Sequence, residues 1–362
     1  MTRLLHLSPT FYSAASVVGG GERYIIYAAR AIALAAEELG RPVTNTLAAF
    51  GEKPGTYQLS GDVTCQVLEA RPWDVTSIQA SEIQDLIRDF DVVFVHQCLY
   101  PFGLFLGAQA QIAGKYVVGL DHGSGEHPIA YHTPEVGLIY DRFQAQSAFV
   151  AATFTDLQGV IEITPGPVDT EFYTPSPGPR DPAQVVAVGR ILPHKGFDRI
   201  INQLPNGLSL SVIGSGYDQD YFSHLERIAA GKSVRFVTGA DDDEVRDILR
   251  GAGLFVHAST HTDYRGRHYA KPELLGLAPL EALACGIPTL VSSAGSLPEL
   301  AAVDGCETFA TDEVLATLLR DHAEGRIDWP GKQLIAKDVE AKYGLRQYGR
   351  KVLHMLGMSE NP

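Results

Sequence analysis

Residues 273–288 combine features that suit the binding of a charged ligand. Pro279 suits the first position of a helix, because its missing N–H would be unpaired there in any case. Gly276, just before that turn, would let a ligand approach the backbone closely. The amides of Leu277 and Ala278 would point outward from the helix start, where the helix dipole favours an anion such as phosphate.

Two glutamates flank this predicted helix start. Glu281 lies one turn into the helix and could reach past the phosphates to a ribose diol, whose two hydroxyls donate hydrogen bonds. Glu273 lies before the turn, on the other side of the phosphates, where the sugar of a nucleotide-sugar would lie. The alternative interpretation is one helix-capping glutamate and one solvated glutamate.

The second candidate segment carries positive charge and lies between a predicted strand and a predicted helix. Gly189 and Arg190 follow the strand, and Lys195 precedes the helix. Arg190 and Lys195 together would bind a diphosphate well, because arginine offers a planar fork of donors and lysine a point charge. The alternative is two surface cations in a loop.

A third candidate segment is the run of glycines at 19–21, between the first predicted strand and a helix. Gly20 and Gly21 would allow close approach of a phosphate to the amides at the helix start. A tight turn capped by Glu22 explains the same residues equally well.

The pattern of apolar residues predicts the elements that must position these segments. Short apolar runs alternate with helical patterns, which is typical of a parallel α/β architecture. We expect two Rossmann-like, doubly wound domains that face a central cleft, where a ligand would bind. The predicted strands are 3–8, 91–96, 116–120, 184–188, 208–213, 234–237, 254–257 and 289–292. The predicted helices are 25–39, 197–204, 220–230, 242–250, 278–284, 314–322 and 343–356.

A proline-rich segment separates the two series of elements. Six of the 21 prolines fall within residues 164–182, and such a density makes a stiff, extended linker. We therefore predict an N-terminal domain over 1–165 and a C-terminal, nucleotide-sugar-binding domain over 166–342. The last helix, at about 343–357, is expected to pack back on the first domain.

Composition narrows the class of protein. The formal net charge of −14 argues against a general nucleic-acid binder. The four cysteines are far apart and contain no CxxC pair, so neither a zinc site nor a disulfide framework is expected. The first residues lack the apolar core of a signal peptide, and no apolar stretch is long enough to span a bilayer. These features favour a cytoplasmic protein without a transmembrane segment.

At this point the sequence resembles a known family. Glu273 and Glu281 are separated by seven residues around the run GLAPLEALACGIP, which resembles the two-glutamate motif of the retaining glycosyltransferases of family 4, whose fold is GT-B. The segments VGRILPHKGFDRII at 188–201 and ITPGPVDTEFYTP at 163–175 resemble the diphosphate-binding loop and the interdomain linker of that family. The resemblance is strong over about 163–302 and weaker over 1–162.

The resemblance implies a role for each candidate residue. Arg190 and Lys195 would bind the donor diphosphate, Glu281 its ribose, and Glu273 the hydroxyls of the donor sugar. Backbone groups at Gly276, Leu277 and Ala278 would bind phosphate, as would Gly20 and Gly21, which could instead approach the acceptor. His122, which follows a strand, matches a histidine near the transferred sugar; a loop histidine in a turn is the alternative. His96, at another strand end, is interpreted as a core residue or part of the cleft wall.

Two features depart from the family pattern. Leu274-Leu275 follow Glu273 where the family commonly has a small residue and then phenylalanine. The loop 260–271 is longer and more cationic than usual, and it is interpreted either as a substrate-facing loop or as a solvated insertion.

The expected function is a metal-independent, retaining glycosyltransferase with no resident cofactor. It would move a sugar from a nucleotide-diphosphate-sugar to a saccharide, lipid-linked or small-molecule acceptor, with no nucleic-acid partner. Two alternatives remain open at this point. One is a sugar-nucleotide epimerase or phosphorolytic enzyme on the same fold, and the other is a noncatalytic sugar-nucleotide or glycan-binding protein.

Overall fold

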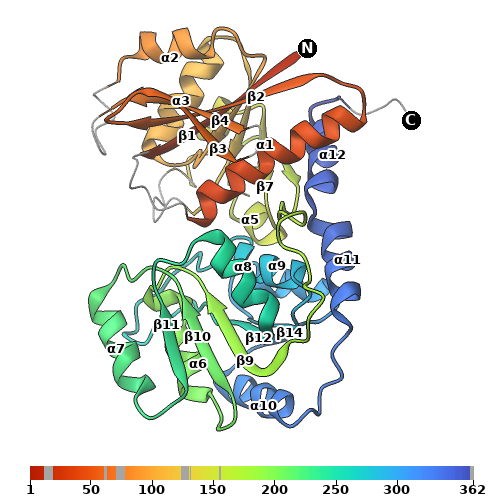
Figure 1. Cartoon of the computed structure of the whole chain (residues 1–362). Helices are drawn as coiled ribbons and strands as arrows, with labels where there is room; N and C mark the ends of the chain where they lie inside the picture. Colours follow the sequence, from red (N-terminus) through yellow and green to blue (C-terminus); the bar gives the residue numbers. More distant parts are fainter. Residues whose placement is uncertain are drawn as a thin grey trace. The chain divides into compact units, whose positions relative to one another are not determined.

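The computed structural model describes residues 1–11, 19–60, 63–70, 78–123, 130, 132–154 and 156–358. The chain divides into two compact units. The first unit comprises Met1–Pro167 and Leu345–Pro362, and the second comprises Val168–Gly344 (Figure 1). The division within the proline-rich segment therefore falls between Pro167 and Val168.

The first unit is built on a sheet with the strand order β3-β4-β2-β1-β5-β6-β7-β8 among the described residues. Neighbouring strands are parallel, except that β3 and β4 form an antiparallel pair. The strands are β1 (Thr2–Phe11), β2 (Val43–Gly51), β3 (Gly55–Ser60), β4 (Val63–Glu69), β5 (Val92–His96), β6 (Tyr116–Leu120), β7 (Arg142–Ala145) and β8 (Val160–Ile163). The helices are α1 (Gly20–Glu38), α2 (Ala80–Ile87), α3 (Pro101–Ile112), η2 (Pro134–Ile139), α5 (Ala148–Thr153) and α12 (Leu345–Met355).

Helix α12 comes from the end of the chain and packs against α1 (Figure 1). Gly349 makes the close approach possible, because a Cβ atom at this position would lie 2.0 Å from the carbonyl oxygen of Ala31. The hydroxyl of Tyr24 on α1 donates to that of Tyr348 on α12 at 3.1 Å. The two helices are thus joined by both packing and a buried hydrogen bond.

The second unit has the strand order β11-β10-β9-β12-β13-β14 among its described residues, all in parallel. The strands are β9 (Asp181–Val188), β10 (Ser209–Ile213), β11 (Val234–Val237), β12 (Ala252–His257), β13 (Thr289–Ser292) and β14 (Cys306–Phe309). The helices are η3 (Pro193–Lys195), α6 (Phe197–Gln203), α7 (Gln219–Ala229), α8 (Asp242–Gly251), α9 (Leu277–Ala284), η4 (Leu297–Ala302), α10 (Asp312–Ala323) and α11 (Lys332–Tyr343). Successive strands extend to one side of β9 and then, from β12, to the other, which is the doubly wound arrangement.

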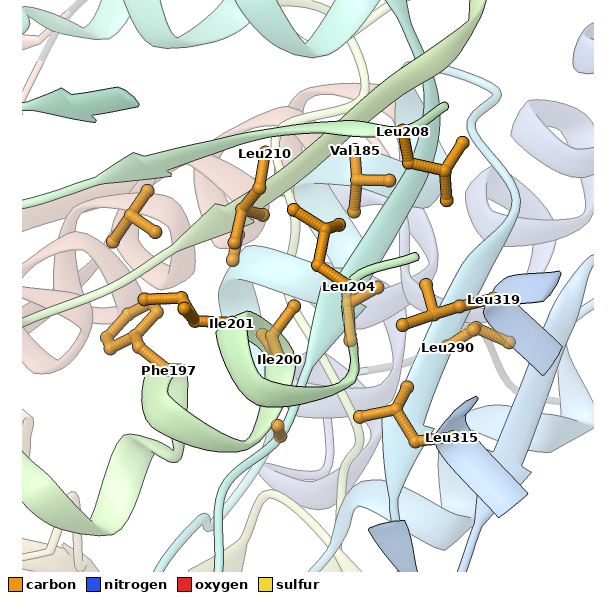
Figure 2. Packing of buried hydrophobic residues seen from close by; sticks show 14 of the residues in the cluster. Val185, Phe197, Ile200, Ile201, Leu204, Leu208, Leu210, Leu290, Leu315 and Leu319 are labelled. Atoms are coloured by element: carbon orange, nitrogen blue, oxygen red, sulfur yellow. The ribbon is translucent and has the colours of Figure 1, made fainter. Parts of the chain in front are cut away.

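The core of the second unit forms where α6 and α10 pack on the sheet. Phe197, Ile200, Ile201 and Leu204 recur at helical spacing and are all buried. Figure 2 shows these side chains meeting those of the strands and of α10. The partners include Val185, Leu210, Leu290, Leu315 and Leu319. This packing fixes the loop that leads from β9 into α6.

The predicted α/β class with two Rossmann-like parallel sheets is confirmed. The sequence analysis did not predict strands β2, β3, β4, β7, β8 and β14 or helices α2, α3 and α5. It also did not predict helix α11 as an element separate from α12. The region predicted as one helix over 343–356 contains the end of α11, a break at Gly344 and then α12. Within the residues that the structure describes, no helix is both long and apolar enough to cross a membrane.

Candidate functional site

The loops that follow β9 and β12 meet at the edge of the second sheet where the strand order reverses. Ligands of doubly wound sheets bind outside the carboxyl ends of the strands at such a point. Gly189 and Arg190 directly follow β9, and His257 is the last residue of β12. Lys195 and Glu273 follow further along the same two connections.

Two close backbone contacts hold the loop after β9 in place. Gly196 has φ +66°, and a Cβ there would lie 2.1 Å from the carbonyl oxygen of Ala258. The amide of Thr260 donates to the carbonyl of His194 at 2.8 Å. The loop therefore lies directly against the chain that leaves β12, which brings Lys195 close to the segment that contains Glu273.

Glu273 is the centre of a compact ionic cluster. Its Oε2 atom lies 2.8 Å from Nζ of Lys195 and 2.8 Å from Nε2 of His257. The side chains of Lys195 and Glu273 are only 12% and 15% exposed, so water screens their charges little. Ser259 Oγ lies 3.0 Å from the same nitrogen of His257. One carboxylate oxygen thus accepts from a cation and an imidazole together.

The cluster fixes the charge state of its members. Burial acts to raise the pKa of Glu273, but the neighbouring Lys195 ammonium and the hydrogen bond from His257 outweigh it and lower that pKa. Burial lowers the pKa of His257, although the Glu273 carboxylate opposes the shift. At neutral pH the site therefore holds an ionised carboxylate, and a neutral imidazole donates to it.

The backbone of Glu273 is held from the other side by the turn after β13. The amide of Ser296 donates to the carbonyl of Glu273 at 3.1 Å. Gly295 has φ +60°, and a Cβ there would lie 2.2 Å from that carbonyl oxygen. The position of the Glu273 side chain is thus determined by packing as well as by its ion pair.

Arg190 adds a second cation to the site, and His194 is a neutral neighbour of Lys195. Arg190 is exposed, and no ion pair joins it to another described residue. Burial, followed by the positive charges of Lys195 and Arg190, lowers the pKa of His194 to about 4. His194 is therefore neutral, and its ring packs against that of Tyr269 with centroids 4.8 Å apart.

The start of α9 lies next in sequence to this cluster. Gly276 is the N-cap with φ +85°, a conformation that favours glycine, and it has no side chain with which to cap the helix. The N–H groups of the first helical turn have no partner inside the helix, so the helix start can receive an anion. Leu277 and Ala278 are partly exposed at this start, whereas Glu281 is 2% exposed.

The loop 260–271 is a short, ordered hairpin built around Asp263. One carboxylate oxygen of Asp263 accepts from the amides of Arg265 at 2.8 Å and Arg267 at 3.0 Å, and the other accepts from the Tyr269 hydroxyl at 3.1 Å. Tyr264 stacks on His224 of α7 with ring centroids 4.4 Å apart. One face of the loop thus packs on α7, and Tyr269 joins it to His194 in the site.

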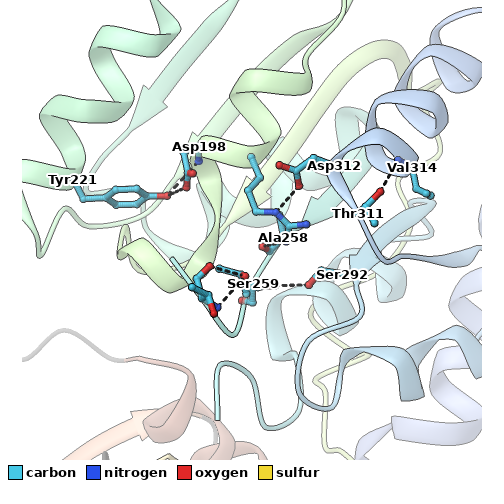
Figure 3. A network of polar contacts seen from close by, with 11 residues as sticks. Asp198, Tyr221, Ala258, Ser259, Ser292, Thr311, Asp312 and Val314 are labelled. Atoms are coloured by element: carbon cyan, nitrogen blue, oxygen red, sulfur yellow. Dashed lines mark hydrogen bonds and ion pairs between the residues drawn. The ribbon is translucent and has the colours of Figure 1, made fainter. Parts of the chain in front are cut away.

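A polar network between α6, α7, α10 and the end of β12 stabilises the loops that follow β9 and β12 (Figure 3). The Tyr221 hydroxyl donates to the Asp198 carboxylate at the start of α6, and the two side chains point toward each other in Figure 3. Arg199 donates to Asp312 at 2.7 Å and to the carbonyl of Ala258 at 3.0 Å. This network ties α6 to α10 and to the end of β12, so it stabilises the framework of the site.

The first unit brings three other predicted residues together. Gly20 and Gly21 form the first turn of α1, within the helix and not in the loop before it. A Cβ at Gly21 would lie 3.5 Å from Cβ of His122, so the glycine lies directly against this histidine. Glu22 Oε2 accepts from the Gly19 amide at 3.0 Å, as the capping interpretation expects.

The sequence analysis missed three contributors to these sites. His257 was recognised only as a strand residue, and His194 only as a neighbour of Lys195. His6 lay inside a predicted strand and was not singled out. The position of His257 at the carboxyl end of a strand was an available clue, because that edge of a parallel sheet is where ligands bind.

Part of the second unit is similar to a known protein family. Residues 169–316 match the family described as glycosyl transferases group 1. A GDP-mannose-dependent alpha-(1-6)-phosphatidylinositol monomannoside mannosyltransferase of Mycolicibacterium smegmatis is 28% identical over 291 residues, covering 67% of this chain and 71% of that protein. A D-inositol 3-phosphate glycosyltransferase of Salinispora arenicola is 28% identical over 225 residues, covering 54% of this chain and 43% of that protein.

Solved structures show the same fold. HepE of Anabaena, in complex with UDP and glucose, aligns with a TM-score of 0.75 and 17% identity, covering 99% of this chain and 100% of that one. The sucrose-phosphate synthase of Thermosynechococcus elongatus aligns with a TM-score of 0.75 and 16% identity, covering 99% of this chain and 98% of that one.

Proposed function

We propose that the chain, which has the GT-B fold, is a retaining glycosyltransferase of family 4. It would transfer a sugar from a nucleotide-diphosphate-sugar to a hydroxyl acceptor. The observation that carries this proposal is the cluster of Lys195, Glu273 and His257 at the reversal of the strand order.

The proposed diphosphate contacts come from three sources. A lysine ammonium has three N–H donors, and Lys195 uses one of them on Glu273. Its other two have no partner among the described residues, so they are available to phosphate oxygens. Arg190 offers its exposed guanidinium, and the start of α9 at Leu277 and Ala278 offers backbone N–H groups. Gly189 and Gly276 would allow the phosphates to approach the backbone.

The proposed contacts to the donor sugar use the Oε1 atom of Glu273. Its Oε2 atom is occupied by Lys195 and His257, but Oε1 has no partner among the residues that the structure describes. An ionised carboxylate only accepts hydrogen bonds, so Oε1 suits the hydroxyls of a donor sugar. Glu281, one turn into α9, is proposed to bind the ribose hydroxyls.

In the proposed reaction, the bond between the anomeric carbon and the diphosphate breaks as the acceptor oxygen attacks from the same face. The acceptor proton passes to the leaving phosphate oxygen, so the configuration is retained and charge is balanced. Fixed positive groups at Arg190, Lys195 and the start of α9 would stabilise the leaving diphosphate. We propose that this stabilisation needs no metal ion.

In the first unit, Gly20, Gly21 and His122 are proposed to contact the substrates. The acceptor is proposed to be a saccharide, a lipid-linked acceptor or a small molecule. The phosphatidylinositol mannoside named for the relative from Mycolicibacterium smegmatis belongs to this chemical range.

The first test is a thermal-shift titration with GDP, UDP, ADP, TDP and CDP, followed by GDP-mannose and UDP-glucose. A ligand that binds only the folded state at 100 times its Kd adds about 2.7 kcal/mol of stability. We expect one nucleotide to raise the melting temperature. We also expect the turnover of the corresponding nucleotide-sugar to be unchanged when EDTA is added. The absence of a shift with every nucleotide would contradict the proposed donor, and loss of turnover in EDTA would contradict metal independence.

A further inference from the structure

Three histidines lie on or directly after three neighbouring strands of the first unit. His6 lies on β1, His96 ends β5, and His122 follows β6. Because these strands are adjacent in the sheet, the three rings lie in a row with their planes nearly parallel, and their centroids are 5.3 Å apart for the first pair and 5.0 Å for the second. Side chains from three separate segments are thus aligned in one row.

The rings also hydrogen-bond one another edge to edge. Nδ1 of His6 lies 3.1 Å from Nε2 of His96, and Nδ1 of His96 lies 2.8 Å from Nε2 of His122. The far end of the row is Asn45, whose Oδ1 lies 3.3 Å from Nε2 of His6. Asn45 is oriented by its amide group, which donates to the carbonyl of Ala29 at 3.0 Å.

All three imidazoles are neutral at physiological pH. Burial lowers the pKa of His6 to about 4 and that of His122 to about 4, and it lowers the pKa of His96 well below the usual value. The buried Asp121 beside His122 acts in the opposite direction but does not outweigh burial. A neutral imidazole has one N–H donor and one lone-pair acceptor, so each ring can donate only once.

Because each ring donates only once, the direction of every hydrogen bond in the row of histidines is determined. The oxygen of Asn45 can only accept, so Nε2 of His6 donates to it and Nδ1 of His6 becomes an acceptor. Nε2 of His96 must then donate to His6, and Nδ1 of His96 accepts. Nε2 of His122 must in turn donate to His96. The remaining nitrogen, Nδ1 of His122, carries a lone pair.

We propose that Asn45, His6 and His96 are positioning residues that fix the Nε2–H tautomer of His122, so that its Nδ1 accepts a hydrogen bond from a carbohydrate hydroxyl. Among the described residues, Nδ1 of His122 has no partner. The ring itself is held by His96 on one side and by Tyr24, whose ring centroid lies 4.7 Å away. The substrate part of this inference rests on the proposed function; the tautomer part does not.

The tautomer is tested directly by long-range 1H–15N NMR on the wild-type protein labelled at histidine, with His122→Ala used to assign the signals. We expect His6, His96 and His122 to be neutral Nε2–H tautomers. A protonated Nδ1 on His122, or a mixture of tautomers, would overturn the proposal. This readout needs no turnover, so it remains informative even if the proposed reaction is wrong.

Two substitutions of His96 separate orientation from packing. His96→Asn places an amide oxygen near the former Nδ1 and can still accept from His122, whereas His96→Phe keeps the ring volume but cannot accept. We expect His96→Phe to lose the single tautomer of His122 and about tenfold in kcat/KM, the scale of one hydrogen bond. We expect His96→Asn to keep the tautomer and more activity than His96→Phe.

The opposite order of activities would assign His96 a packing role only and overturn the proposal. The substrate whose KM changes shows which molecule carries the hydroxyl that binds His122. If KM rises for the nucleotide-sugar in His96→Phe, the hydroxyl belongs to the donor sugar; if KM rises for the acceptor, it belongs to the acceptor. If His96→Phe yields a mixture of His122 tautomers but leaves the kinetics with both substrates unchanged, the contact between His122 and a substrate hydroxyl is refuted.

Discussion

The ammonium of Lys195 lies 2.8 Å from the carboxylate of Glu273, although the two residues are 78 positions apart in the sequence. One residue comes from the connection after β9 and the other from the connection after β12, which are adjacent strands. The pair therefore exists only because the strand order reverses at this point. In a site with little water, each charge depends on the other for stabilisation.

The first prediction concerns the carboxylate. Glu273→Gln leaves Lys195 without its counter-ion and removes the anion proposed to bind the sugar. We expect kcat to fall about 100-fold, on the scale of one lost transition-state contact, and the free energy of unfolding to fall by about 1–3 kcal/mol. Steady-state kinetics and urea unfolding measure the two effects. Glu226→Gln, an exposed glutamate on α7, is the matched control, and full activity of Glu273→Gln would refute the assignment.

The coupling between the two charges can be measured separately with Lys195→Ala and the double variant. Residues in contact typically show an interaction energy of about 0.5–3 kcal/mol in such a cycle. We expect Lys195→Ala to weaken binding of the nucleoside diphosphate at least about tenfold, equivalent to about 1.4 kcal/mol. Strictly additive effects of the two substitutions on stability would show that the ion pair does not form in solution.

The second prediction uses the exposure of Arg190. Because this guanidinium forms no ion pair with a described residue, Arg190→Ala should change the free energy of unfolding by less than about 0.5 kcal/mol. Its proposed role is to bind phosphate, so calorimetry should show at least about tenfold weaker binding of the nucleoside diphosphate. Lys337→Ala, which removes an exposed cation on α11, should leave that affinity unchanged. Equal affinities for the two variants would remove Arg190 from the site.

The third prediction is a pH dependence of stability that arises from the buried histidines. Burial lowers the pKa of His6 to about 4, below the unfolded value of about 6.5. The unfolded state therefore binds more protons between these values, and stability is lost as the pH falls through this window, by up to about 1.4 kcal/mol per pH unit for each such group. The lowered pKa of Glu273 acts only below the unfolded glutamate value of about 4.3, outside most of this window.

Urea unfolding of His6→Phe between pH 7 and pH 5 tests this sign. The variant ring can still stack on Phe94, whose centroid lies 4.8 Å from that of His6, but it cannot titrate. We expect a flatter dependence of stability on pH than in the wild type. An unchanged slope in His6→Phe would show that His6 titrates normally.

The alternation of strands and helices predicted the class of fold, because parallel sheets require apolar strands and amphipathic crossovers. The pattern could not predict the hairpin of β3 and β4, because β3 contains few apolar residues and its residues Gly55–Gln58 are mostly exposed. For the site, glycine and proline next to charged residues predicted the loops at Arg190 and Gly276. The contact of His257 with Glu273 was not predictable, since it depends on which strands are neighbours and not on spacing along the chain.

The fourth prediction concerns the hairpin around Asp263. Its carboxylate holds the amides of Arg265 and Arg267 and the hydroxyl of Tyr269, whose ring packs against His194. Asp263→Ala leaves these donors unpaired, so we expect a loss of about 1–3 kcal/mol in the free energy of unfolding and a KM for the nucleotide-sugar that rises several-fold. Asp220→Asn is the control.

Asp220 is 89% exposed at its side chain, and it forms an ion pair with Arg265 of the hairpin at 3.8 Å. Such a surface ion pair contributes about 0–1 kcal/mol, so Asp220→Asn should leave KM unchanged. If Asp263→Ala destabilises the protein but keeps the wild-type KM, the loop 260–271 is a structural insertion. If KM rises in Asp263→Ala but not in Asp220→Asn, the same loop forms part of the substrate site, to which Asp263 is connected through Tyr269 and His194.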